Sequence, residues 1–134
     1  MPESKFNYNA RIFNPPAPAL KIELRSPAML ETSTPEEVIA LIDTGADTSC
    51  IPLEFVRKLN LKEVDSIRFG RADEREEAFE ERKVYSVYIT VPLLLPILAR
   101  VIPLKNSPYA ILGRDLINNW LLKLDGQNLI GAIS

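Results

Sequence analysis

An apolar stretch of the chain ends abruptly in acidic residues. Val38-Ile-Ala-Leu-Ile42 is entirely apolar, Asp43-Thr-Gly45 follows it directly, and Asp47 comes two residues later. Asp, Thr and Gly after a strand also form an ordinary turn, because Asp bonds its own backbone and Gly accepts positive φ. However, two acids delivered by an apolar strand are costly unless they have partners or a chemical role. Asp43 is therefore the first candidate for a catalytic carboxylate.

The residue types that are missing narrow the chemistry. The chain has no histidine, and its one cysteine is Cys50. Ser-His-Asp and Cys-His mechanisms need an imidazole base, so both are excluded. The usual zinc and copper ligands are missing as well, and a lone cysteine cannot form an intrachain disulfide. We predict no metal and no other cofactor, and we interpret Cys50 as a small buried apolar side chain.

Two segments resemble the signatures of one known family. Ala40-Leu-Ile-Asp-Thr-Gly-Ala-Asp-Thr48 resembles the active-site segment of retroviral and retroviral-like aspartic proteases. Ala110-Ile-Leu-Gly-Arg-Asp-Leu116 is similar to the family's second signature, which opens its C-terminal helix. The segments occur in the expected order, and the resemblance extends over about residues 20 to 130. It implies a retropepsin-like aspartic protease.

The resemblance also implies a role for individual residues. Asp43 would be the catalytic acid, Thr44 the hydroxyl that locks two active-site loops together across a dimer, and Gly45 the residue that lets the backbone pass close to substrate. Asp47 and Arg114 match a family pair that supports the active site and the dimer interface through a bidentate ion pair.

Ala46 stands where many two-lobed aspartic proteases carry Ser or Thr. It has no hydroxyl to donate to the catalytic carboxylates, so we expect an activity profile that extends from mildly acidic toward neutral pH. The resemblance further implies that Ile111, Leu112 and Gly113 pack behind the catalytic loop.

An aspartic protease needs two carboxylates, and the chain has a single Asp-Thr-Gly. Two acids in close contact cannot both ionise, so one keeps its proton while the other activates water; aspartic proteases are the usual illustration of this rule. A chain of 134 residues with one motif must find the second in an identical subunit, related by a two-fold axis. We predict a homodimeric endopeptidase that binds polypeptide substrate in extended form.

Two other interpretations stay open. The first is a dimeric binding or assembly module of the same fold with little or no proteolysis. The second is an unrelated β-barrel binding module in which Asp43-Thr-Gly45 is only a turn. The family's flap over the substrate usually has a glycine-rich tip, whereas the corresponding stretch, Gly70–Arg75, has one glycine and runs into the acidic segment Asp73–Arg82.

Short strands must position these residues. Leu20–Leu24 alternates apolar and polar residues, which predicts a half-buried strand, and the continuously apolar Val38–Ile42 predicts a strand buried on both faces. The remaining predicted elements are a short helix over Pro52–Leu59, a hairpin of Val64–Gly70 with Val84–Val91, a strand over Leu93–Leu104, a helix after Gly113, and two strands around Asp125-Gly126.

These elements predict a mainly-β fold, a retropepsin-like closed barrel or sandwich with a short C-terminal helix and one lobe per subunit. We divide the chain into a Pro-containing N-terminal arm, residues 1–19, and a protease domain, residues 20–134. Net charge is −2, which gives no sign of nucleic-acid binding. We see neither a signal peptide at the N-terminus nor an apolar run long enough to span a bilayer, so we expect a cytoplasmic protein.

Overall fold

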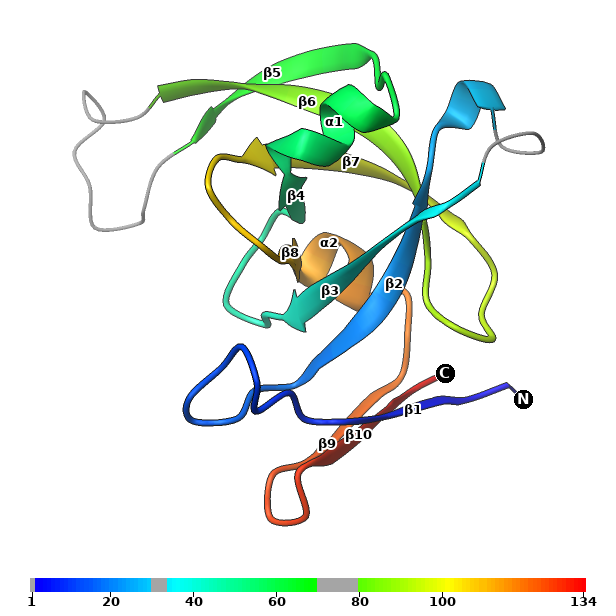
Figure 1. The fold of residues 1–134 in the computed structure, drawn as a ribbon, viewed down its shortest axis with the longest axis vertical. Coiled ribbons are helices and arrows are strands. Elements are labelled where there is room, and N and C mark those ends of the chain that lie inside the picture. Colours follow the sequence, from blue (N-terminus) through cyan, green and yellow to red (C-terminus); the bar gives the residue numbers. More distant parts are fainter. Residues whose placement is uncertain (1, 30–33, 70–79) are drawn as a thin grey trace.

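The computed structural model describes residues 2–29, 34–69 and 80–134 (Figure 1). The predicted flap tip, Gly70–Arg75, lies outside the described residues, as does most of the acidic segment. The elements are β1 (Ser4–Asn7), β2 (Ala19–Arg25), η1 (Pro27–Met29), β3 (Glu36–Ile42), β4 (Cys50–Pro52), α1 (Leu53–Lys58), β5 (Glu63–Phe69), β6 (Glu80–Thr90), β7 (Ile97–Leu104), β8 (Ala110–Leu112), α2 (Arg114–Ile117), β9 (Leu122–Asp125) and β10 (Ile130–Ile133).

Six strands close into a barrel. The larger sheet has the order β2-β3-β8-β4-β7-β6-β5, and an additional antiparallel pairing between β2 and β6 joins its ends. β5 lies outside this closure and continues the sheet as the hairpin partner of β6. The mainly-β barrel with a short C-terminal helix is therefore confirmed. Closure leaves the barrel strands without free edges, which stabilises so small a sheet.

β3 carries the candidate site and is buried on one face. Val38, Ala40 and Ile42 are buried in the barrel core, whereas Ile39 and Leu41 are half-buried. The prediction that both faces are buried is wrong. An all-apolar strand does not distinguish a core face from a half-covered one, and here the second face leads to Asp43 instead of into the core.

The predicted strand over Leu93–Leu104 begins later than expected. β7 starts at Ile97, and the preceding residues make a turn in which the Leu94 N–H donates to the Val91 carbonyl at 3.0 Å. Pro92 and Pro96 flank this turn, and proline has no N–H for a strand ladder. The turn leaves Leu95 85% exposed.

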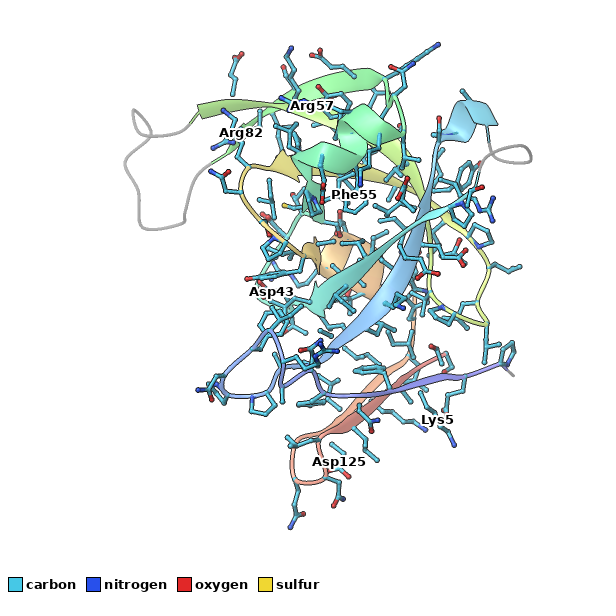
Figure 2. The ribbon with its side chains drawn as sticks, in the orientation of Figure 1. Lys5, Asp43, Phe55, Arg57, Arg82 and Asp125 are labelled. Carbon is cyan, nitrogen blue, oxygen red and sulfur yellow. The ribbon has the colours of Figure 1, made fainter. Side chains whose placement is uncertain are left out.

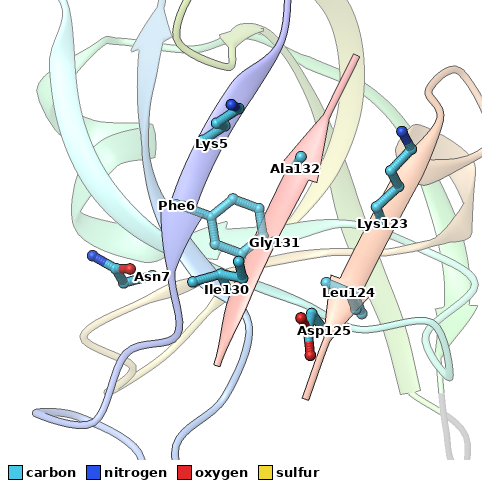
Figure 3. A pocket seen from close by; sticks show the side chains of 9 residues that line it. All are labelled: Lys5, Phe6, Asn7, Lys123, Leu124, Asp125, Ile130, Gly131 and Ala132. Carbon is cyan, nitrogen blue, oxygen red and sulfur yellow. The ribbon is translucent and has the colours of Figure 1, made fainter. Parts of the chain in front are cut away.

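The two ends of the chain meet in a second sheet of order β1-β10-β9. It lies below the barrel in Figure 1, and both of its pairings are antiparallel. The ring of Phe6 lies across Gly131, where an added Cβ would clash with the ring (Figure 3). Ile133 continues into the main core. The Pro-containing arm thus contributes a strand of its own, β1, which packs with the C-terminus. No helix in the described ranges is long and apolar enough to cross a membrane.

Candidate active site

Asp43 follows the last residue of β3, and neighbouring strands fix its backbone. Its N–H donates to the carbonyl of Leu112 at 3.0 Å, and the Ala46 N–H returns to the Asp43 carbonyl at 3.2 Å. The preceding N–H, of Ile42, donates to the carbonyl of Pro18 in the N-terminal arm at 2.9 Å. Figure 2 shows the Asp43 side chain beyond the end of β3. The turn is therefore held from β8 on one side and from the arm on the other.

The Asp43 carboxylate is half-buried and keeps acceptor capacity. Its Oδ1 accepts the N–H of Gly45 at 2.9 Å, while Oδ2 has no hydrogen bond from any described residue. A Cβ on Gly45 would lie 3.2 Å from Asp43 Oδ1, which is tighter than most contacts of a real Cβ. Glycine is therefore the residue that fits beside this carboxylate. The arrangement leaves one oxygen available to a substrate, a water or a second carboxylate.

Arg114 holds the same turn by two contacts. Its N–H donates to the carbonyl of Ala46 at 2.8 Å, and Nη1 donates to the carbonyl of Thr44 at 2.8 Å. The predicted ion pair between Arg114 and Asp47 is not present, because the guanidinium is directed at the turn's backbone. Asp47 is exposed, and no described residue forms an ion pair or hydrogen bond with it. Thr44 is also exposed, with its hydroxyl unbonded within the described chain.

A buried serine binds the far end of the loop, and sequence reasoning missed it. Ser49 is 0% exposed. Its hydroxyl donates to Asp115 Oδ1 at 2.6 Å, its N–H donates to Asp115 Oδ2 at 3.0 Å, and its Oγ accepts the N–H of Gly113 at 2.9 Å. Asp115 lies in the first turn of α2, whose N-cap residue is Gly113, and two of the three hydrogen bonds to its carboxylate come from Ser49. A lone Ser before the apolar Cys50-Ile51-Pro52 was the available signal for a buried polar group with a dedicated partner.

Gly113 lies against the loop from behind, as the resemblance implied. A Cβ there would lie 2.9 Å from the Ala46 carbonyl oxygen and 3.0 Å from the backbone carbon of Thr48. Both obstacles are backbone atoms, so a side chain could be accommodated only by moving the loop. The second signature segment therefore acts as a support for the first.

Cys50 is buried, 4% exposed, behind the active-site loop. Burial, followed by the negative charges of Asp115 and Asp47, raises the pKa of its thiol to about 11. A thiol with this pKa stays protonated near neutral pH and is a poor nucleophile. This agrees with its interpretation as a buried apolar side chain. In the described ranges no group of three or more acidic, cysteine or histidine side chains could hold a metal ion.

Comparison with known proteins agrees with this geometry. The family model described as retroviral aspartyl protease matches residues 14–125, which is more than half of the chain. The chain belongs to the retroviral aspartyl protease family. The match includes Asp43, Arg114 and part of the N-terminal arm. No curated protein sequence matches the chain.

Solved structures of this family share the fold. A retropepsin-like aspartic protease from Rickettsia conorii superposes with a TM-score of 0.61 at 13% identity, covering 98% of this chain and 89% of its own. The simian foamy virus protease gives 0.51 at 15% identity, covering 74% and 92%. The EIAV protease, solved with an inhibitor, gives 0.51 at 22% identity, covering 85% and 93%. At these identities the likeness concerns the fold alone.

Proposed function

We propose that the protein is an aspartic endopeptidase whose active site forms when two copies of the chain bring their Asp43 residues together. The observation that carries this proposal is the Asp43 carboxylate itself: half-buried, fixed through its backbone, and with Oδ2 unbonded by any described residue. A single chain supplies one such group. A second Asp43 beside it would share one proton with the first, giving one general base and one general acid.

In the proposed reaction, the ionised Asp43 of one copy removes a proton from a water that attacks the scissile carbonyl. The protonated Asp43 of the other copy donates a hydrogen bond to the carbonyl oxygen, which stabilises the developing charge. The proton then passes to the leaving amine nitrogen as the peptide bond breaks. The exposed Thr44 hydroxyl is available to bond the partner's loop and so hold the two carboxylates in register.

The terminal sheet offers an edge on which a second copy could pair. Leu121 and Ser134 exchange both backbone hydrogen bonds, at 2.9 and 3.1 Å. Antiparallel pairing alternates, so the N–H and C=O groups of Leu122 and Leu124 point away from β10. No described strand covers that side of β9.

Apolar surface adjoins this open edge. Leu121 is 58% exposed and Leu124 is 42% exposed. A hollow of about 520 Å³ lies over the same sheet, lined on this side by Lys123, Leu124 and Asp125 (Figure 3). We therefore propose that β9 pairs with its symmetry mate around a two-fold axis, which would extend the terminal sheet across both subunits.

Cleavage of a diverse peptide library by the native protein and by Asp43→Asn tests the catalytic proposal. The substitution preserves size and removes the ionisable group, so cleavage should fall to background while folding and dimerisation persist. Cleavage retained by Asp43→Asn would place the active site elsewhere. A native protein that dimerises and cleaves nothing would support the binding or assembly module instead.

Sedimentation of Leu124→Lys tests the dimer edge, because a two-fold axis would bring the two added charges close together. Leu95→Lys is the matched control, since Leu95 is 85% exposed on the turn between β6 and β7, outside the terminal sheet. We expect Leu124→Lys to weaken both dimerisation and cleavage, and Leu95→Lys to change neither. Unchanged dimerisation in Leu124→Lys would exclude β9 as the dimer edge.

A further inference from the structure

The hollow over the terminal sheet lies on the face that points away from the barrel. Its volume is about 520 Å³, and the residues that line it all belong to β1, β9 and β10 (Figure 3). Phe6 and Ile133 pack against the barrel core. Because alternate residues of a strand point to opposite faces, Lys5, Ala132 and Lys123 point outward. Volumes of about 300–1,000 Å³ are typical of sites for small molecules.

Two lysines flank one end of this hollow. Lys5 is opposite Ala132 on β10, and Ala132 is opposite Lys123 on β9. Cross-strand partners share a face of the sheet, and two strand spacings separate the lysine Cα atoms by about 10 Å. Figure 3 shows both side chains extending past the small Ala132 toward the same end. Two amines on flexible stems at this spacing can reach a single anion.

Neither lysine is held by a strong ion pair. Lys5 lies 3.9 Å from Glu3, and the Lys5 side chain is 81% exposed. Exposed pairs of this kind contribute little, so Lys5 can exchange this partner for another anion. Lys123 forms no ion pair with any described residue.

The opposite end of the hollow carries a fixed negative charge. Asn7, Ile130 and Asp125 form the corresponding row across the three strands. The Asp125 carboxylate accepts the side-chain amide of Asn128 at 2.8 Å and its backbone N–H at 3.0 Å. These bonds, the side-chain bond first, hold the pKa of Asp125 below its usual range. A bound anion is therefore directed to the lysine end of the hollow.

Apolar groups lie between the two charged ends. Gly131 and Ala132 leave the central strand open, and Ile130 beside them is 46% exposed. Leu124, on β9, is 42% exposed. The aliphatic stems of the lysines add apolar surface below their charged groups. The hollow thus joins a positive end to an apolar floor.

We infer that the outer face of the terminal sheet binds a free, negatively charged amphiphile with an unbranched apolar tail, such as a straight-chain carboxylate. Its head group lies between Lys5 and Lys123, and its tail covers Gly131 and Ile130. A hollow takes a single tail, whereas a flat bilayer cannot enter it. This binding does not depend on the proposed catalysis by Asp43, because every group that it uses belongs to the terminal sheet.

Isothermal titration calorimetry of the native chain with hexanoate, octanoate and decanoate, each below its micelle concentration, tests the ligand class. We expect the affinity to rise about threefold for each CH₂ group that the hollow buries. Decyltrimethylammonium has the decyl tail and a positive head, and it should bind about 10-fold more weakly than decanoate. Equal binding of decanoate and decyltrimethylammonium, or no binding of decanoate, would overturn the inference.

Variants separate the head site from the tail site. The double variant Lys5→Gln with Lys123→Gln should weaken decanoate binding about 5- to 10-fold, whereas arginine at both positions should preserve it. Lys21→Gln is the matched control, because Lys21 is 62% exposed on β2, outside the terminal sheet. Ala132→Leu fills the floor and should weaken decanoate binding more than hexanoate binding.

Two results with these variants would contradict the site. Decanoate affinity that is unchanged in the folded double glutamine variant would place the carboxylate elsewhere. Decanoate binding that disappears as protein concentration rises would assign the hollow to a second copy of the chain, and the inference would be wrong. If Ala132→Leu fails to fold, the lysine variants and the tail-length series still decide, since they change only exposed charges or the ligand.

Discussion

Two aspartates follow two parallel strands that lie side by side, and their surroundings differ. Asp43 comes directly after β3, and its carboxylate accepts one hydrogen bond, from the N–H of Gly45. Asp115 comes three residues after β8, and both of its oxygens are occupied, by the N–H and hydroxyl of Ser49 and by the N–H of Leu116. The Asp43 carboxylate can still accept further hydrogen bonds, whereas both oxygens of Asp115 already accept hydrogen bonds within the fold.

The difference shows how a small barrel can fix the position of an acid that we propose to be catalytic. The proposed role of Asp43 in catalysis requires free lone pairs, so side-chain hydrogen bonds cannot be what fixes its position. The surrounding backbone does this instead, through Arg114 on the near side of the loop and through Asp115 and Ser49 on the far side. The contact residues of the supporting acid are buried or half-buried, where a charge-assisted bond is strong. The carboxylate with spare capacity is therefore the one that we propose for catalysis, and the saturated carboxylate is the structural one.

Asp115→Ala should give the largest loss of stability. It leaves the N–H and hydroxyl of the buried Ser49 without their acceptor, and we expect unfolding free energy to fall by about 2–4 kcal/mol. Asp43→Ala is the matched control and should cost less than about 1 kcal/mol, because it removes one bond at an exposed turn. Denaturant titration at one fixed protein concentration measures both. Equal losses would mean that the two acids do not differ as their contacts indicate.

Gly113→Ala and Gly45→Ala sharpen the comparison at the backbone. The added methyl at Gly113 meets backbone atoms of Ala46 and Thr48, so we expect a loss of about 1–3 kcal/mol and a displaced loop. At Gly45 the methyl meets only the Asp43 side chain, which can rotate away.

Gly45→Ala should therefore lower cleavage more than it lowers stability, and Gly113→Ala should lower both. Melting temperature and kcat/KM, measured on the same preparations, separate the two effects. Stability lost equally in both variants would contradict this distinction.

Most of the fold could be predicted because its signals are local. Alternation identified β2, proline and apolar spacing identified α1, and the abrupt end of an apolar run located Asp43. The site's support could not be predicted in the same way. The bond between Ser49 and Asp115 joins residues 66 positions apart, and no local pattern distinguishes it from a helix cap. The edge-on ring contact between Phe13 and Tyr109 joins residues that are still further apart in the sequence.

The apolar stretches gave wrong predictions where they adjoin proline residues or solvent. Val38–Ile42 contains no polar residue that could reveal its half-buried face, on which Ile39 and Leu41 lie. Leu93 and Leu95 are apolar enough for a strand, yet they lie in a turn between two prolines. In both regions the apolar residue types are compatible with burial or with exposure. The segments that pack against them determine which of the two occurs.

Arg114→Ala tests whether the guanidinium binds the Thr44 carbonyl or the Asp47 carboxylate. It removes the bond to the Thr44 carbonyl at a largely exposed site, so we expect a stability loss of about 1 kcal/mol together with reduced cleavage. Asp47→Ala should change stability little, since no described residue bonds its carboxylate. Urea midpoints and kcat/KM for both variants give the answer. An equal loss of stability in Asp47→Ala would instead support the ion pair between Arg114 and Asp47 that the sequence predicted.

The smallest expected effect is a change in the thiol pKa of Cys50 when either aspartate is replaced. Burial is the main cause of its raised pKa, about 11, and the negative charge of Asp115 comes next, while Asp43 contributes least among the neighbouring charges. Asp115→Asn should therefore lower the thiol pKa more than Asp43→Asn does, with both values staying above that of a free thiol. Because the chain has a single cysteine, a ¹³C label at its β-carbon gives one NMR signal that can be followed against pH.

The same shift has a stability consequence with a definite sign. The folded protein holds the thiol proton more tightly than the unfolded chain, whose reference pKa is 9.0. This contribution to stability is fully present below about pH 9 and is lost as pH rises toward 11. Cys50→Ala should remove that loss while leaving stability near pH 7 to be decided by packing alone. If Asp43→Asn moved the Cys50 signal as far as Asp115→Asn does, the charge of the Asp43 carboxylate would act on the core as strongly as that of Asp115, and the two aspartates would not differ in the way that we propose.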